Sequence, residues 1–69
     1  MAQTREELVE WFESACALAR RVSIDQQCTQ HVYAIIDYVD GLPTITAFGT
    51  SEWYDNATVR SYTRGDQQF

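Results

Sequence analysis

The sequence has 69 residues, of which 45% are hydrophobic, 13% aromatic and 22% charged, and its formal net charge is −5. This apolar and aromatic content excludes a disordered chain, and the length is near the lower limit for a domain that folds alone. The basic residues are all arginine and are outnumbered ten to five by acids, so direct binding to nucleic-acid phosphates, which needs clustered Lys and Arg, is not expected.

Neither a signal peptide nor a membrane span is expected. Residues 1–7 lack the apolar run of a signal peptide, and no segment approaches the roughly 20 apolar residues of a membrane span. Two cysteines, Cys16 and Cys28, do not make a disulfide framework. We therefore expect a soluble, cytoplasmic protein with reduced thiols and no membrane contact.

A helix is predicted over about residues 4–22. Thr4 and Glu7 have the spacing of a capping box, in which each side chain satisfies a free backbone N–H of the other residue. Apolar residues then recur at helical spacing and form one stripe: Leu8, Trp11, Phe12, Ala15, Leu18, Ala19 and Val22. The polar stretch 23–30 is expected to be a loop.

Residues 31–50 predict a β-hairpin. Two runs rich in β-branched and aromatic residues flank Asp40-Gly41, a dipeptide that favours the positive φ angles of a two-residue turn. This turn sets a register in which Tyr33 faces Phe48 and Ile35 faces Thr46. The face that carries Val32, Ala34, Ile36, Ile45 and Ala47 is uniformly apolar and is the expected seat of the helix.

The C-terminal third has two alternatives. Residues 58–63 have strand chemistry, whereas residues 51–54 could cap and begin a second helix; we favour the strand. Residues 65–69 are expected to fray. The predicted fold class is therefore α+β in a single domain over residues 1–69, with an N-terminal amphipathic helix packed on a small antiparallel sheet.

The helix covers only one face of this sheet, and the opposite face carries Tyr33, Ile35 and Phe48. That face could be solvated, covered by Trp53 and Tyr54, or docked on another chain. Aromatic side chains dominate binding hot spots, so we predict a partner-binding site at these three residues. If Phe48 is instead packed inside the monomer, an acidic surface becomes the better candidate.

That acidic surface is a row on the predicted helix. Glu6, Glu10 and Glu13 fall on one side at i, i+4 and i+7, and no cation lies four residues away to neutralise them. The row is either a solvated polar face or, together with Asp37, an electrostatic surface for a basic partner.

Residue patterns that could carry chemistry are incomplete. Cys28 and His31, with Cys16, supply three possible metal ligands, but structural zinc normally takes four. A thiol nucleophile at Cys28 with His31 as its base lacks a third residue to orient it, and no glycine-rich phosphate motif is present. We expect no metal, no cofactor and no enzymatic activity.

These observations predict a small non-enzymatic protein-binding module, accessory or inhibitory, that acts by occupying the surface of a partner. Two alternatives remain. The first is an acidic mimic of nucleic acid that blocks a DNA- or RNA-binding protein, and the second is a small structural homodimer.

Overall fold

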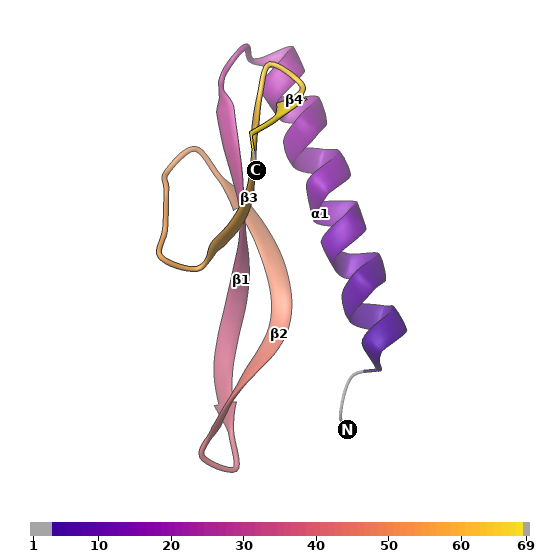
Figure 1. Cartoon of the computed structure of the whole chain (residues 1–69), viewed down its shortest axis with the longest axis vertical. Coiled ribbons are helices and arrows are strands. Elements are labelled where there is room, and N and C mark those ends of the chain that lie inside the picture. The colour runs from indigo at the N-terminus through magenta and orange to yellow at the C-terminus, as the bar shows by residue number, and fades with distance from the viewer. Residues whose placement is uncertain (1–3, 69) are drawn as a thin grey trace.

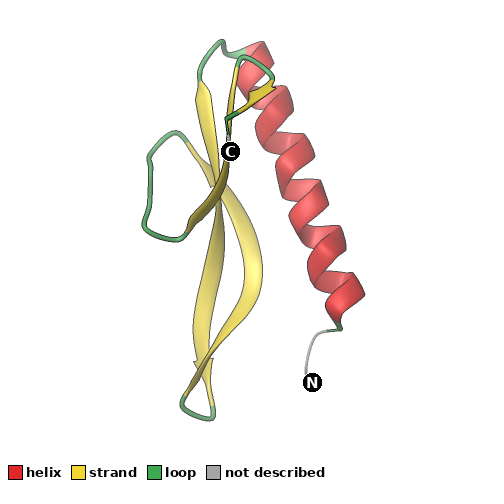
Figure 2. Cartoon of the chain, in the orientation of Figure 1, coloured by secondary structure: helices red, strands yellow, loops and turns green. Residues whose placement is uncertain are grey.

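The computed structural model describes residues 4–68, which form one helix and a four-stranded antiparallel sheet. Helix α1 spans Arg5–Asp25, and the strands are β1 (Thr29–Val39), β2 (Leu42–Ser51), β3 (Thr58–Thr63) and β4 (Asp66–Gln67). The strand order is β2-β1-β3-β4, and α1 lies along one side of the sheet (Figures 1 and 2). The predicted α+β arrangement is confirmed, and residues 58–63 form a strand.

Helix α1 begins as predicted and ends later. Thr4 has extended backbone angles, and its hydroxyl accepts a hydrogen bond from the Glu7 N–H at 3.2 Å. The helix continues to Asp25, because Ser23 belongs to the core rather than to a loop. The Ser23 hydroxyl donates to the Arg20 carbonyl at 2.7 Å and accepts from the Gly65 N–H at 2.9 Å, which fastens this end of α1 to the C-terminal turn.

The hairpin turns at Asp40-Gly41, where φ is 53° and 78°, and Val39 pairs with Leu42 as predicted. The predicted register holds only as far as the pair Ile36–Ile45. Thr46 is then an extra residue, so that Ile35 pairs with Ala47. The extra residue moves the β2 side chains beyond Thr46 to the face opposite the predicted one. The predicted pairing of Tyr33 with Phe48 is therefore wrong.

The C-terminal residues are ordered by a second turn. Arg64 and Gly65 have φ of 50° and 88°, the same combination as in the first hairpin, and they join β3 to β4. The Gln68 N–H then donates to the Ser61 carbonyl at 2.8 Å. Where fraying was expected for residues 65–69, Asp66 and Gln67 pair with β3, while residue 69 lies outside the described residues.

The core lies between α1 and the half of the hairpin that is farther from the Asp40-Gly41 turn. Its buried members are Ala15, Cys16, Ala19, Val32 and Tyr62, with Phe12 and Phe48 packed against them. Toward the turn, α1 and the hairpin diverge (Figure 1). The expected core residues Ile36 and Ile45 are consequently 52% and 37% exposed, so their predicted burial under the helix is wrong.

Candidate interaction surfaces

The predicted aromatic patch is divided between the two faces of the sheet. Phe48 pairs with Ala34 and lies on the helix side, where its ring centroid is 5.3 Å from that of Phe12. Tyr33 pairs with Gly49, and its ring lies so close that a Cβ added at Gly49 would be 2.5 Å from it. The Thr46 bulge thus separates Phe48 from Tyr33 and Ile35, and the three residues do not form one surface.

The sheet face turned away from α1 is partly covered by the chain itself. The loop between β2 and β3 lies on this side (Figure 1), and its Tyr54 ring meets the His31 ring edge-on at 5.6 Å. His31 Nδ1 lies 2.6 Å from the Ser61 hydroxyl, and the hydroxyls of Thr29 and Thr63 are 3.0 Å apart. Tyr54 therefore covers the His31 end of this face, whereas Ile35 on the same face is 41% exposed.

The acidic row remains on the surface. Glu6, Glu10 and Glu13 are all exposed on α1. Asp37 lies apart from them on β1, where its carboxylate accepts the Tyr38 N–H at 2.8 Å. Within residues 4–68 the one salt bridge joins Arg21 to Asp25, at 3.8 Å. The row therefore presents its charge without a cationic partner among the described residues, and Asp37 belongs to a different part of the molecule.

One apolar surface is the turn end of the hairpin, residues 35–45, which we call the hairpin arm. Its exposed large apolar side chains are Ile35, Ile36, Tyr38, Val39, Leu42 and Ile45. Sequence analysis placed Ile35 on the uncovered face but expected the helix to cover Ile36 and Ile45, so the arm as a whole was not predicted. A signal was present: neighbouring residues Tyr38 and Val39 point to opposite faces, and one helix covers only one of them.

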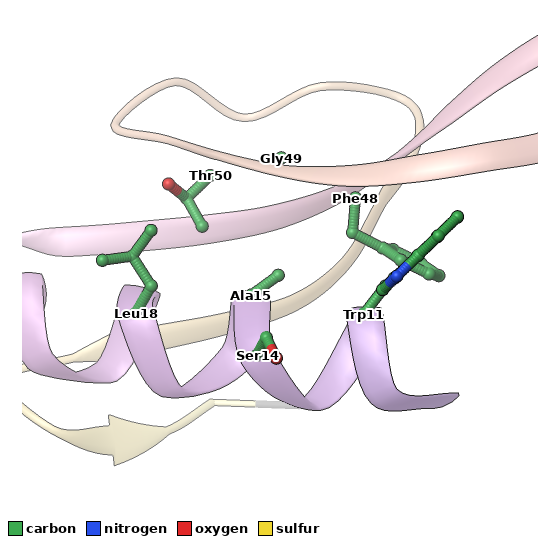
Figure 3. A pocket seen from close by; sticks show the side chains of 7 residues that line it. All are labelled: Trp11, Ser14, Ala15, Leu18, Phe48, Gly49 and Thr50. Carbon is green, nitrogen blue, oxygen red and sulfur yellow. The ribbon is translucent and has the colours of Figure 1, made fainter. Parts of the chain in front are cut away.

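A second apolar surface is a groove of about 450 Å³ between α1 and β2 (Figure 3). It is lined by Trp11, Ser14, Ala15, Leu18, Phe48, Gly49 and Thr50. Trp11 and Phe48 lie at one end of the groove, Leu18 and Thr50 at the other, and Ala15 opposite Gly49 in the middle (Figure 3). The polar side-chain groups in the lining are the hydroxyls of Ser14 and Thr50 and the indole N–H of Trp11, and none is charged, so the groove favours apolar groups rather than a charged ligand.

An arginine lies beneath the helix. The Arg60 guanidinium carbon is 5.0 Å from the centroid of the Phe12 ring, within the range of a cation–π contact. Arg60 Nε is buried, and no described residue accepts its hydrogen bond. The neighbouring Tyr62 is 7% exposed. Burial raises the pKa of the Tyr62 phenol, a hydrogen bond with Cys16 adds to this rise, and Arg60 opposes it.

Because the pKa of Tyr62 is raised, the free energy of unfolding varies with pH in the alkaline range. Above about pH 10 the phenol loses its proton in the unfolded chain but keeps it in the folded chain, so stability falls as the pH rises toward the folded pKa. Urea unfolding at several values between about pH 8 and 11 measures this slope. We expect Tyr62→Phe to flatten it; an equal slope in both proteins would show that Tyr62 does not contribute.

The residues considered as metal ligands or nucleophiles are dispersed. Cys16 is buried in the core, whereas Cys28 is half-buried and its sulfur lies 3.5 Å from Gln30 Nε2. Across residues 4–68, no three His, Cys, Asp or Glu side chains gather as a metal ion requires. His31 is engaged by Ser61 and Tyr54.

No helix among the described residues is long and apolar enough to cross a membrane. Comparison with protein-family models, with curated proteins and with solved structures finds no match to this chain. The surfaces described above are therefore the basis for any functional proposal.

Proposed function

We propose that this chain is a small, non-enzymatic, cytoplasmic protein-binding module, which acts by occupying a partner surface with its hairpin arm. The observation that carries this proposal is the exposure of the arm, on which Tyr38 and Leu42 are 72% and 67% accessible. Large exposed apolar side chains gathered on one segment are typical of interaction sites. Aromatic residues such as Tyr38 are enriched at the centres of interfaces.

The chemistry of the arm defines the kind of partner. Asp37 and Asp40 lie beside its apolar side chains, and the turn contains no cation. The complementary partner surface is an apolar cleft with basic residues at its rim. Interfacial charges of this kind raise the association rate and fix orientation more than they raise affinity.

Affinity capture from a lysate of the source cells tests the arm with a matched pair of variants. Leu42→Glu places a charge at the centre of the proposed contact, while Val9→Glu places the same charge on exposed α1. We expect Leu42→Glu to lose, by at least tenfold, a partner that the unchanged protein and Val9→Glu both retain. Equal retention by both variants would contradict a role for the arm.

The acidic mimic of nucleic acid is the second candidate. Because Phe48 packs against Phe12, the acidic row ranks above the predicted aromatic patch, but it ranks below the hairpin arm. The mimic is favoured by one observation: Glu6, Glu10 and Glu13 are exposed and form no salt bridge within the described residues. A complex made by a mimic weakens steeply with added salt and is displaced by DNA or RNA. A complex made by the hairpin arm resists both treatments, so the captured complex distinguishes the two functions.

A further inference from the structure

Strand β2 has an open edge beside the groove. In the strand order β2-β1-β3-β4 it pairs on one side only, and its ten residues carry no charge. Natural edge strands are commonly protected against pairing by charges, proline or bulges. Here Pro43 and the Thr46 bulge protect the half near the turn, whereas residues 47–51 contain none of these devices. Residues 47–51 are therefore the part of β2 that is suited to pair with a further strand.

Helix α1 carries a row of five residues, which we call the groove stripe, and three of them, Trp11, Ser14 and Leu18, line the same groove. Spacings of four, three, four and three residues separate Glu7, Trp11, Ser14, Leu18 and Arg21. This is the spacing of residues that face another helix. The two large members, Trp11 and Leu18, are 39% and 53% exposed. The stripe therefore has the pattern of a helix–helix contact but no helix against it in the described chain.

We propose that the groove is the interface of a homodimer, in which residues 47–51 of two copies pair antiparallel about a two-fold axis at Gly49. Such an interface is self-complementary: where one residue of the first copy contacts a second residue of the other copy, the same contact recurs with the copies exchanged. On this axis Phe48 meets Thr50 of the second copy. Both helices lie on the same face of one continuous eight-stranded sheet, and their groove stripes face each other.

The helix stripe is self-complementary about the same axis. Figure 3 places the middle of the helix wall, at Ser14 and Ala15, opposite Gly49. Antiparallel pairing of two α1 helices about this point brings Trp11 of each copy to Leu18 of the other. It also brings Glu7 of each copy to Arg21 of the other, so opposite charges meet at both ends. Strand and helix thus share one symmetry axis.

These charges favour a second copy as the occupant although the chain is acidic. The acidic row of Glu6, Glu10 and Glu13 lies outside the groove stripe, and β2 is uncharged. Among residues 4–68, Arg21 is engaged only by the 3.8 Å pair with Asp25, and the two side chains are 82% and 64% exposed. A pair so exposed contributes little and leaves Arg21 available to the partner's Glu7.

The size of the chain supports the same occupant. A stable interface covers about 800 Å² on each partner, which is roughly 15% of the 5174 Å² that this chain exposes. Very small domains bury too little surface alone, and oligomerisation is a usual compensation.

Sedimentation over a wide concentration range tests the dimer. We expect the unchanged protein to be dimeric at micromolar concentration, and Leu18→Glu to be monomeric with an unchanged helical circular-dichroism signal. The control Val9→Glu, exposed on α1 but outside the stripe, should remain dimeric. An unchanged protein that stays monomeric up to millimolar concentration would overturn the proposal.

A charge exchange then tests the axis itself. Glu7→Arg and Arg21→Glu each place like charges opposite one another, so each variant alone should dissociate at about tenfold higher concentration than the unchanged protein. A mixture of the two variants restores opposite charges at both ends and should form heterodimers. If the protein dimerises but the mixture gains no affinity, the two-fold axis proposed here is wrong. Because the hairpin arm lies outside this interface, either result leaves the proposed function to its own test.

Discussion

Val32→Asp is expected to abolish folding. Val32 has no exposed surface and lies at the centre of the core between α1 and the sheet. A carboxylate there loses its hydration without gaining a partner, so the substitution adds a desolvation cost to the lost packing. A cost of about 4 kcal/mol or more is expected for such a change, against a total stability of roughly 3–10 kcal/mol for a domain of this length.

Val59→Asp is the matched control for this experiment. Val59 lies on the neighbouring strand β3 but is 44% exposed, so its carboxylate stays hydrated and the cost should remain below about 1 kcal/mol. Circular dichroism and urea unfolding compare the two variants. Similar loss of structure in both would mean that β3 tolerates no charge anywhere, and a folded Val32→Asp would show that Val32 is not at the centre of the core.

The sequence predicted the elements whose signals are local. Thr4 and Glu7 mark the start of α1 by side-chain capping, and Asp40-Gly41 marks a turn that needs positive φ. Both depend on residues within four positions of each other, so neither requires knowledge of the rest of the fold. The Arg64-Gly65 turn had the same kind of signal, a glycine two residues beyond a strand-forming run, but its position near the end of the sequence suggested fraying.

The features that could not be predicted depend on distant contacts. Ser23 extends α1 because its hydroxyl bonds to Gly65, forty-two positions away. The Thr46 bulge has no marker in its own sequence, since threonine fits regular strands as well as bulged ones. It lets Phe48 reach Phe12 on the helix while Tyr33 packs over Gly49 on the other face. One extra residue therefore moved a predicted interface residue into the core.

The two apolar surfaces of the molecule follow from that same bulge. Beyond Thr46 the β2 side chains turn toward α1 and build one wall of the groove. Before it, toward the turn, the helix no longer covers the hairpin, and the arm is left exposed on both faces. The bulge thus separates a segment that packs against the helix from the exposed hairpin arm. The proposed dimer and the proposed partner contact therefore use different segments of the hairpin.

Phe48→Ala tests the bulged register directly. In the register predicted from the turn alone, Phe48 lies on the face away from α1, and its removal would scarcely change stability. In the structure its ring lies 5.3 Å from Phe12 and lines the groove. Removing the ring leaves Phe12 without this neighbour and opens a cavity, so we expect the free energy of unfolding to fall by about 2–4 kcal/mol, since Phe48 is only partly buried.

Leu42→Ala on the same strand is the control for Phe48→Ala. Leu42 is 67% exposed on the hairpin arm, so its truncation removes little buried surface and should cost less than about 1 kcal/mol. Urea unfolding of both variants gives the comparison, and it should be made at a concentration low enough to dissociate any dimer. A large effect at Phe48 and a small one at Leu42 supports the register with Thr46 as the extra residue. Equal, small effects would return Phe48 to the exposed face and restore the aromatic patch of Tyr33, Ile35 and Phe48 as the binding surface.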